Sequence, residues 1–236
     1  MKNQFIITEN VEHFDSICVE LEGAESQIGP SLAMVTGPAG RGKSEAARHY
    51  ATNSSAVYIP PLNKRTGLML LKTICFELAF VKPGRTDACV DLISEEMARS
   101  RRLIILDEAD LLPISIIEMI RNINEICGCP VVLMGEQELK GKIGSRRRLA
   151  SRIRRKIEFS PLSQADIVLF FRKNMGVDLT AVPEAISLLH EYSKGDWRPV
   201  LVAALDIERA MIASGISDAS IELIKGVLDG RKNGRS

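Results

Sequence analysis

The sequence has few of the residues from which metal centres and disulfide frameworks are built. Its 236 residues include three histidines, at positions 13, 49 and 190, and five cysteines. Histidines scattered in this way support neither a metal site nor a serine–histidine nucleophile. An odd number of cysteines without framework spacing indicates reduced thiols, so we expect a cytoplasmic protein.

Long apolar runs and a strong net charge are also missing. No segment approaches the length of a membrane span, and the first residues do not read as a signal peptide, so we expect no membrane partner. The formal net charge of +1 excludes a uniformly basic surface. Positive charge is nevertheless concentrated in residues 139–157, which contain nine lysines and arginines and no acidic residue.

A complete phosphate-loop motif is present. Residues 37–44 read Gly-Pro-Ala-Gly-Arg-Gly-Lys-Ser, between an apolar segment of strand type and a helical segment. Glycines in such a turn let successive backbone N–H groups surround a phosphate, and the helix start adds the positive end of its dipole. A glycine turn with a chance lysine is the alternative. We expect nucleotide contacts from the loop and the residue after it, namely Gly37, Pro38, Ala39, Gly40, Arg41, Gly42, Lys43, Ser44 and Glu45.

Two adjacent carboxylates complete the predicted site. Residues 103–108 read Leu-Ile-Ile-Leu-Asp-Glu, an apolar strand that ends in Asp107 and Glu108. We expect Lys43 to reach the β- and γ-phosphates, and Ser44 and Asp107 to hold Mg²⁺. Glu108 is the candidate general base that polarises the attacking water. Helix capping is the alternative role for the acidic pair, but the sequence favours an ATPase that uses ATP and Mg²⁺.

The order of predicted elements indicates an α/β fold. Apolar strands alternate with helices up to residue 160, at about 31–36, 55–59, 102–107, 130–134 and 156–159. This alternation is typical of a parallel sheet between helices. A basic helix is expected at about 145–153. After Pro161 only helices are predicted, so we expect an ATPase core at 1–160, a small helical lid at 161–229 and a disordered tail at 230–236.

This layout resembles the AAA+ superfamily, in which one phosphate-loop core precedes a helical lid. Residues 149–153, Leu-Ala-Ser-Arg-Ile, look like the arginine-finger box, which makes Arg152 the catalytic arginine offered to a neighbouring subunit. Residues 195–198, Gly-Asp-Trp-Arg, look like the sensor 2 motif, whose arginine, here Arg198, touches the nucleotide. A solvated or DNA-facing Arg152, and an Arg198 without a ligand, are the alternatives. The resemblance leaves open which of Arg146, Arg147, Arg148 and Arg152 is the finger.

A closer resemblance is to the B transposition proteins of Mu-like transposable phages. It covers roughly residues 30–215 and is carried by residues 35–50, 106–110, 132–135 and 151–153. It implies a protein of the bacterial or phage-infected host cytoplasm that assembles on double-stranded DNA as an ATP-bound filament. Such proteins capture target DNA without sequence specificity and deliver it to a partner transposase, which stimulates a slow ATPase.

Two departures from that family affect what is expected. Only about 30 residues precede the core, so the N-terminal helix-turn-helix domain is expected to be absent. The fourth strand is followed by Gly-Glu-Gln at 135–137, where the family usually has a neutral polar sensor. Gln137 is therefore the candidate sensor of the γ-phosphate, unless sensing is weak and hydrolysis slow.

Two basic loops are candidates for the DNA contact. In a helical assembly, the loop after the second strand and the basic helix can both face the central axis, and their cations would bind phosphates in a salt-dependent manner. Solvated surface residues are the alternative. The candidates are Lys64, Arg65, Thr66, Lys142, Arg146, Arg147 and Arg148.

Other functions fit parts of this pattern. Residues 107–110 read Asp-Glu-Ala-Asp, as in a class of helicases, but those enzymes need two motor lobes and only one phosphate-loop motif occurs here. A secretion-type ATPase that acts on protein, a helicase loader or initiator, and a nucleotide switch with negligible turnover remain as alternatives.

Overall fold

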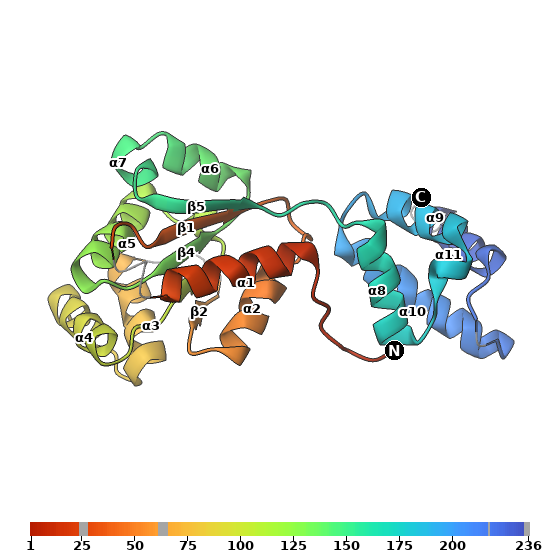
Figure 1. Cartoon of the computed structure of the whole chain (residues 1–236), viewed down its shortest axis with the longest axis horizontal. Helices are drawn as coiled ribbons and strands as arrows, with labels where there is room; N and C mark the ends of the chain where they lie inside the picture. Colours follow the sequence, from red (N-terminus) through yellow and green to blue (C-terminus); the bar gives the residue numbers. More distant parts are fainter. Residues whose placement is uncertain (24–27, 61–65, 217, 234–236) are drawn as a thin grey trace. The chain divides into compact units, whose positions relative to one another are not determined.

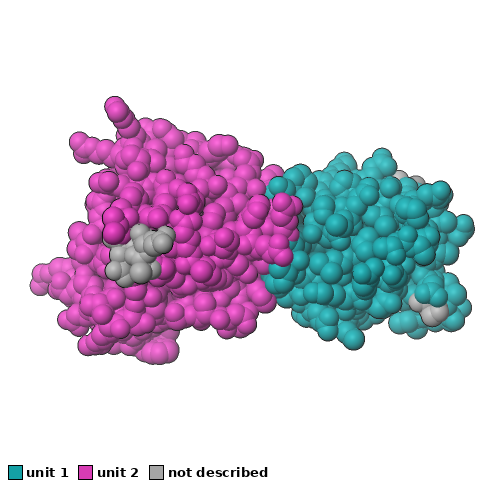
Figure 2. Space-filling model, in the orientation of Figure 1, with its two compact units in different colours: residues 1–8, 39–42, 160–236 teal, residues 9–38, 43–159 magenta. Residues whose placement is uncertain are grey.

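The computed structural model describes residues 1–23, 28–60, 66–216 and 218–233. Its contacts divide the chain into two compact units (Figure 2). The α/β unit contains residues 9–38 and 43–159, and the helical unit contains residues 1–8, 39–42 and 160–236. The division interrupts the phosphate loop, because residues 39–42 pack with the helical unit.

A five-stranded sheet forms the centre of the α/β unit. All its strands are parallel, and their order is β2-β3-β4-β1-β5. Parallel strands place their carboxyl ends at the same edge of the sheet. The predicted α/β class with a parallel sheet is thereby confirmed. The strands are β1 (Leu32–Thr36), β2 (Val57–Ile59), β3 (Ile104–Leu106), β4 (Val131–Met134) and β5 (Ile153–Glu158).

Helices cover the sheet, with α1 and α2 together on one side of it (Figure 1). Alternation of side chains along the strands divides the core between the two faces. Ile104 and Leu106 join the cluster that contains α3, α4 and α5, whereas Ile105, also fully buried, points to the opposite face. The helices are α1 (Glu9–Glu22), α2 (Lys43–Asn53), α3 (Gly67–Ala79), α4 (Thr86–Arg99), the short 3₁₀ helix η2 (Ala109–Leu111), α5 (Ile114–Cys127), α6 (Gln137–Gly144) and α7 (Arg147–Ala150).

The basic segment differs from its prediction as one helix at about 145–153. It is divided between α6, α7 and β5, and β5 already begins at Ile153. Arg155 and Lys156 are exposed on β5, which among the strands of the described residues pairs with β1 alone and forms an edge of the sheet. Charged side chains are typical of edge strands, because they discourage pairing with another chain. The predicted helix is therefore shorter than expected, and the strand predicted at about 156–159 begins earlier, at Ile153.

The helical unit has its own apolar core, which includes Phe171, Leu189 and Ile207. Residues 1–8 were expected in the ATPase core but belong to this unit. They are held there because the N–H groups of Lys2 and Gln4 bond to the backbone and side-chain oxygens of Asn174, each at 2.7 Å. The helices are α8 (Gln164–Met175), the 3₁₀ helix η3 (Leu179–Ala181), α9 (Pro183–Ser193), α10 (Trp197–Ser214) and α11 (Ile221–Asn233).

The expected disorder of residues 230–236 is wrong for residues 230–233, which continue α11. Residues 234–236 lie outside the described part of the chain. None of the helices in the described residues combines the length and the apolar character that crossing a membrane requires.

Two isoleucines of α5 differ in burial and can be compared to test how much the core contributes to the stability of the α/β unit. Ile117 of α5 is fully buried, whereas Ile126 of the same helix is 68% exposed. We expect Ile117→Ala to lower the free energy of unfolding by about 2–5 kcal/mol, because it leaves a cavity. Ile126→Ala should change it by no more than about 0.5 kcal/mol. Urea denaturation followed by circular dichroism measures both, and equal losses would contradict this packing.

Candidate nucleotide site

The phosphate loop connects β1 to α2, as the motif predicts. Gly37, Gly40 and Gly42 have φ values of 148°, 77° and 89°. These lie in the region that L-residues rarely adopt and that glycine adopts readily. At Gly40 a side chain is also excluded sterically, because a Cβ atom there would collide with the carboxylate of Asp196. The loop therefore needs glycine for its backbone conformation and for its packing.

Lys43 begins α2 and lies almost fully buried. Its Nζ donates hydrogen bonds to the carbonyl oxygens of Gly37, at 2.6 Å, and Pro38, at 2.9 Å. A buried ammonium needs such acceptors, because its desolvation is otherwise costly. The loop thus places a positive charge inside its own turn, where an anion would be attracted.

Asp107 follows β3 directly and is 7% exposed. Its Oδ1 accepts a hydrogen bond from the N–H of Glu108, at 2.9 Å, and its Oδ2 accepts one from the hydroxyl of Tyr58, at 2.7 Å. Each carboxylate oxygen has two lone pairs, so each keeps one for a further contact. A fixed carboxylate of this kind fits Mg²⁺, which prefers oxygen ligands and is usually held by one or two carboxylates together with phosphates.

Glu108 has an unusual backbone and an unusual electrostatic environment. Its φ and ψ are 49° and 40°, a left-handed conformation that is uncommon for a residue other than glycine and occurs more often at functional sites. Burial raises the pKa of its carboxyl group, and the charges of Asp107, Asp110 and Glu136 raise it further, while Lys43 lowers it. A raised pKa makes a carboxylate a stronger base, which suits the predicted role of Glu108.

The residues that follow β4 place more polar groups at the carboxyl ends of the strands. Oδ1 of Asp110 accepts a hydrogen bond from the N–H of Glu136, at 3.2 Å. The side-chain amide of Gln137 donates to the carboxylate of Glu158, at 2.7 Å. Glu158 is the last residue of β5, so Gln137 is held at the carboxyl ends of the strands. Its role as a γ-phosphate sensor stays a prediction.

Residues 39–42 contact the helical unit through α10. The N–H of Trp197 donates to the carbonyl oxygen of Gly40, at 3.0 Å. Asp196, which sequence reasoning missed, caps α10 by accepting from the N–H of Arg198, at 2.8 Å, and packs against Gly40. An aspartate just before a helix is a signal that could have revealed the cap. The predicted Arg198 therefore lies in the first turn of α10 of the helical unit.

The predicted DNA-contacting residues have different surroundings. Lys64 and Arg65 lie outside the described residues, and the hydroxyl of Thr66 caps α3 by accepting from the N–H of Met69. The Nζ of Lys142 donates to the carbonyl oxygens of Asp110 and Leu112. These two contacts hold the ammonium of Lys142 against the backbone.

Several arginines of the basic segment are more exposed than Lys142. Arg146 lies 3.9 Å from the carboxylate of Glu118, and the Nε of Arg152 forms an ion pair of 2.6 Å with Glu125. Within the described ranges no ion pair is formed by Arg147 or Arg148 of α7, and both side chains are exposed. These two arginines, together with the exposed Lys156 of β5, are therefore the cations of the segment most available to a polyanion.

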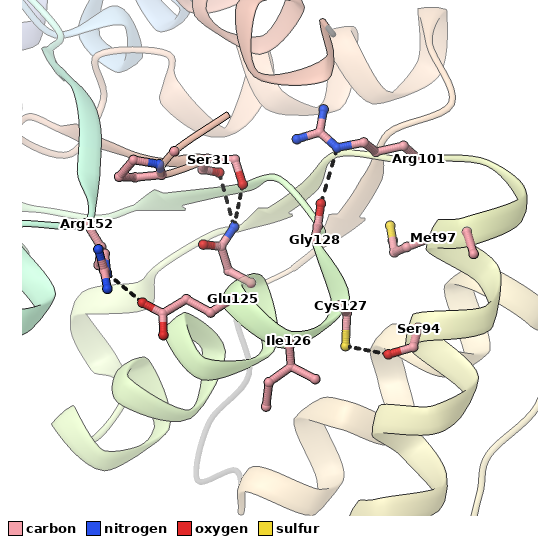
Figure 3. A pocket seen from close by; sticks show the side chains of 13 residues that line it. Ser31, Ser94, Met97, Arg101, Glu125, Ile126, Cys127, Gly128 and Arg152 are labelled. Carbon is pink, nitrogen blue, oxygen red and sulfur yellow. Dashed lines mark hydrogen bonds and ion pairs between the residues drawn. The ribbon is translucent and has the colours of Figure 1, made fainter. Parts of the chain in front are cut away.

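A pocket of about 740 Å³ lies at the amino ends of the strands (Figure 3). Its lining includes Ser31, Arg101, Gly128 and Arg152, which precede β1, β3, β4 and β5 respectively. The Arg152–Glu125 ion pair lies within this pocket (Figure 3). Since the phosphate loop and the acidic pair follow their strands, this pocket is separate from the nucleotide site.

Sequence comparisons agree with this geometry. The family model described as "AAA domain" matches residues 27–143. The chain is 30% identical over 146 residues to the ATP-dependent target DNA activator B of Escherichia phage Mu. This match covers 58% of this chain and 47% of the phage protein. The chain is also 30% identical over 151 residues to the Mu-like prophage FluMu DNA transposition protein B of Haemophilus influenzae, covering 60% of this chain and 53% of that protein. The chain thus spans about half the length of these curated relatives.

Comparisons with solved structures extend over nearly the whole chain. The ORC2 protein of Aeropyrum pernix has a TM-score of 0.68 at 14% identity, covering 98% of this chain and 69% of that one. Cdc6p of Pyrobaculum aerophilum has a TM-score of 0.66 at 16% identity, covering 96% and 69%. At such identities the likeness establishes the fold. The chain therefore has the AAA+ fold, with a parallel-sheet core and a helical unit, and is similar in sequence to the B transposition proteins of Mu-like phages.

Proposed function

We propose that this protein is an ATP- and Mg²⁺-dependent DNA-binding ATPase that assembles on target DNA and delivers it to a partner transposase. The observation that supports this most is a buried phosphate-loop lysine, Lys43, whose charge lowers the pKa of Glu108 in the acidic pair, in a chain 30% identical to an ATP-dependent target DNA activator. The AAA+ fold and the phage relatives support ATP hydrolysis in transposition. The proposal also includes DNA capture, self-assembly on DNA and action in the cytoplasm.

In the proposed reaction, backbone N–H groups of the phosphate loop and the ammonium of Lys43 bind the phosphates of ATP. Ser44 and Asp107 would hold Mg²⁺, which neutralises phosphate charge during the transfer. Glu108 orients a water molecule and takes its proton as that water attacks the γ-phosphorus, and ADP leaves. Gln137 is the proposed sensor of the γ-phosphate, and Arg198 is proposed to contact the same nucleotide.

Arg152 is the proposed arginine finger for a neighbouring copy of the chain. Its guanidinium is planar and always charged, which suits neutralisation of phosphate charge in the transition state. In the structure this group pairs with Glu125 and both side chains are exposed. Assembly would therefore exchange one exposed ion pair, which contributes little to stability, for the contact with the neighbour's nucleotide.

DNA binding is proposed to depend on exposed cations. Arg147 and Arg148 fit phosphate contacts, with Arg146 beside them and the loop that contains Lys64, Arg65 and Thr66 as a second element. Lys142 contributes less, because its ammonium is held by two carbonyl oxygens. Contacts to phosphates carry no base information, which suits a protein that accepts many targets. We also propose that residues 161–229 act as the lid of the 1–160 core.

Two substitutions separate nucleotide binding from hydrolysis. Lys43→Ala should weaken ATP binding by about 10- to 100-fold, because a charge-assisted hydrogen bond contributes about 1.5–3 kcal/mol. Glu108→Gln should retain ATP, strengthen assembly on DNA and lower kcat by about 10²- to 10⁴-fold, because only the base is lost. Fluorescent ATP binding, filament sedimentation and phosphate release measure these effects. Wild-type turnover in Glu108→Gln would show that Glu108 is not the base.

The contribution of Arg147 and Arg148 to DNA binding can be compared with that of two exposed arginines outside the basic segment. Arg147→Ala with Arg148→Ala should weaken duplex binding and reduce the slope of log affinity against log salt by about 2, since each lost phosphate contact changes it by about 0.9. Replacing the exposed Arg85 and Arg209 by Ala removes the same charge elsewhere. Fluorescence anisotropy at several salt concentrations compares the two. An equal slope change in both double variants would exclude a specific role for α7.

Mixed assemblies test whether Arg152 acts on a neighbouring subunit. Arg152→Ala alone should lower the DNA-stimulated hydrolysis rate by about 10³-fold, the scale of an arginine finger. Glu125→Gln, which removes the partner of Arg152, should not lower it. Mixing Arg152→Ala with Glu108→Gln should restore hydrolysis, because the second protein supplies the arginine to sites that keep their base. A mixture no more active than its components would contradict action in trans.

A further inference from the structure

A row of polar contacts connects α2 with the carboxylate that follows β3. Glu45 and Arg48, one turn apart on α2, form an ion pair. The Cζ of Arg48 lies 5.7 Å from the centre of the Tyr58 ring, and the Tyr58 hydroxyl donates to Oδ2 of Asp107 at 2.7 Å. All four residues belong to the α/β unit. The helix that carries Lys43 and Ser44 is thus linked to the acidic strand end.

The parallel pairing of β2 with β3 explains why these side chains meet. Tyr58 is in register with Ile105, which is two residues before Asp107. Since successive side chains alternate between faces, Tyr58, Ile105 and Asp107 share one face of the sheet. The contact between Arg48 and the Tyr58 ring shows that this is the face covered by α2. A one-residue shift between β2 and β3 would turn Tyr58 to the opposite face.

The Tyr58 hydroxyl orients the Asp107 carboxylate and is not needed for packing of the apolar core. Its neighbours Val57 and Ile59 are each 2% exposed and already anchor β2, whereas Tyr58 is only partly buried. A tyrosine hydroxyl ordinarily keeps its proton at neutral pH and can donate a hydrogen bond. With the Glu108 N–H on the other oxygen, two donors fix the rotation of the Asp107 carboxylate.

We propose that Tyr58 is a positioning residue for the metal-binding carboxylate. It holds Asp107 so that the remaining lone pairs of the carboxylate are presented for Mg²⁺–ATP, and Arg48 couples this orientation to α2. The inference rests on the proposed function of the nucleotide site. Partners of metal ligands act in this way generally, and their loss typically lowers metal affinity by about 10- to 100-fold.

Tyr58→Phe tests this inference, because it removes one hydroxyl and keeps the ring. Binding of a fluorescent ATP analogue is titrated with Mg²⁺, and separately measured in EDTA. We expect the Mg²⁺ concentration for half-maximal enhancement to rise about tenfold or more in Tyr58→Phe. Binding in EDTA and the thermal midpoint should remain those of the wild type, because the loop, Lys43 and the core are intact.

The matched control is Tyr50→Phe. The Tyr50 hydroxyl also donates to a carboxylate, that of Glu22, but Glu22 is not part of the nucleotide site. Tyr50→Phe should leave the Mg²⁺ titration unchanged. Arg48→Met should shift the titration less than Tyr58→Phe, and the double variant should shift it less than the product of the two single effects, because both act through one contact.

The outcomes distinguish this inference from the function on which it rests. If the wild type binds the analogue without any Mg²⁺ dependence, the proposed nucleotide site is wrong. If the wild type depends on Mg²⁺ and Tyr58→Phe has the same titration, the positioning role is wrong. If Tyr58→Phe weakens binding equally in Mg²⁺ and in EDTA, the hydroxyl has a merely structural role, which also overturns the inference.

Discussion

The parallel pairing of β3 with β4, and of β4 with β1, is the constraint on which the site depends. Because these three strands run in one direction, the segments that follow them gather at one edge of the sheet. The phosphate loop, the Asp107–Glu108 pair and the Glu136–Gln137 segment each follow one of these strands. No side chain has to cross the core, and the apolar strands can be buried fully while the polar groups stay at their ends.

Much of the fold and of the site could be predicted from the sequence because the signals for them are local. Strand burial and helix periodicity are local properties, and the phosphate loop carries its chemistry in consecutive residues such as Lys43 and Ser44. The acidic pair is recognisable because an apolar strand precedes it. These features need no knowledge of which strand lies beside which.

The errors and omissions arise where distant segments decide the structure. Residues 1–8 were placed in the wrong unit because their attachment depends on Asn174, far along the chain. The basic helix was predicted to extend too far, to about residue 153, because the start of β5 at Ile153 depends on its pairing with β1. Tyr58 was missed because its bond to Asp107 depends on the register between β2 and β3.

In the proposed function, the state of the bound nucleotide controls DNA binding. The most direct test is fluorescence anisotropy of a labelled duplex of arbitrary sequence, titrated with the wild-type protein in ATP with Mg²⁺, in ADP, and without nucleotide, at two salt concentrations. The account predicts tight binding only with ATP and Mg²⁺, weakening steeply as salt rises. Binding that is absent in every nucleotide state, or equal in all of them, would contradict a role in ATP-dependent capture of target DNA.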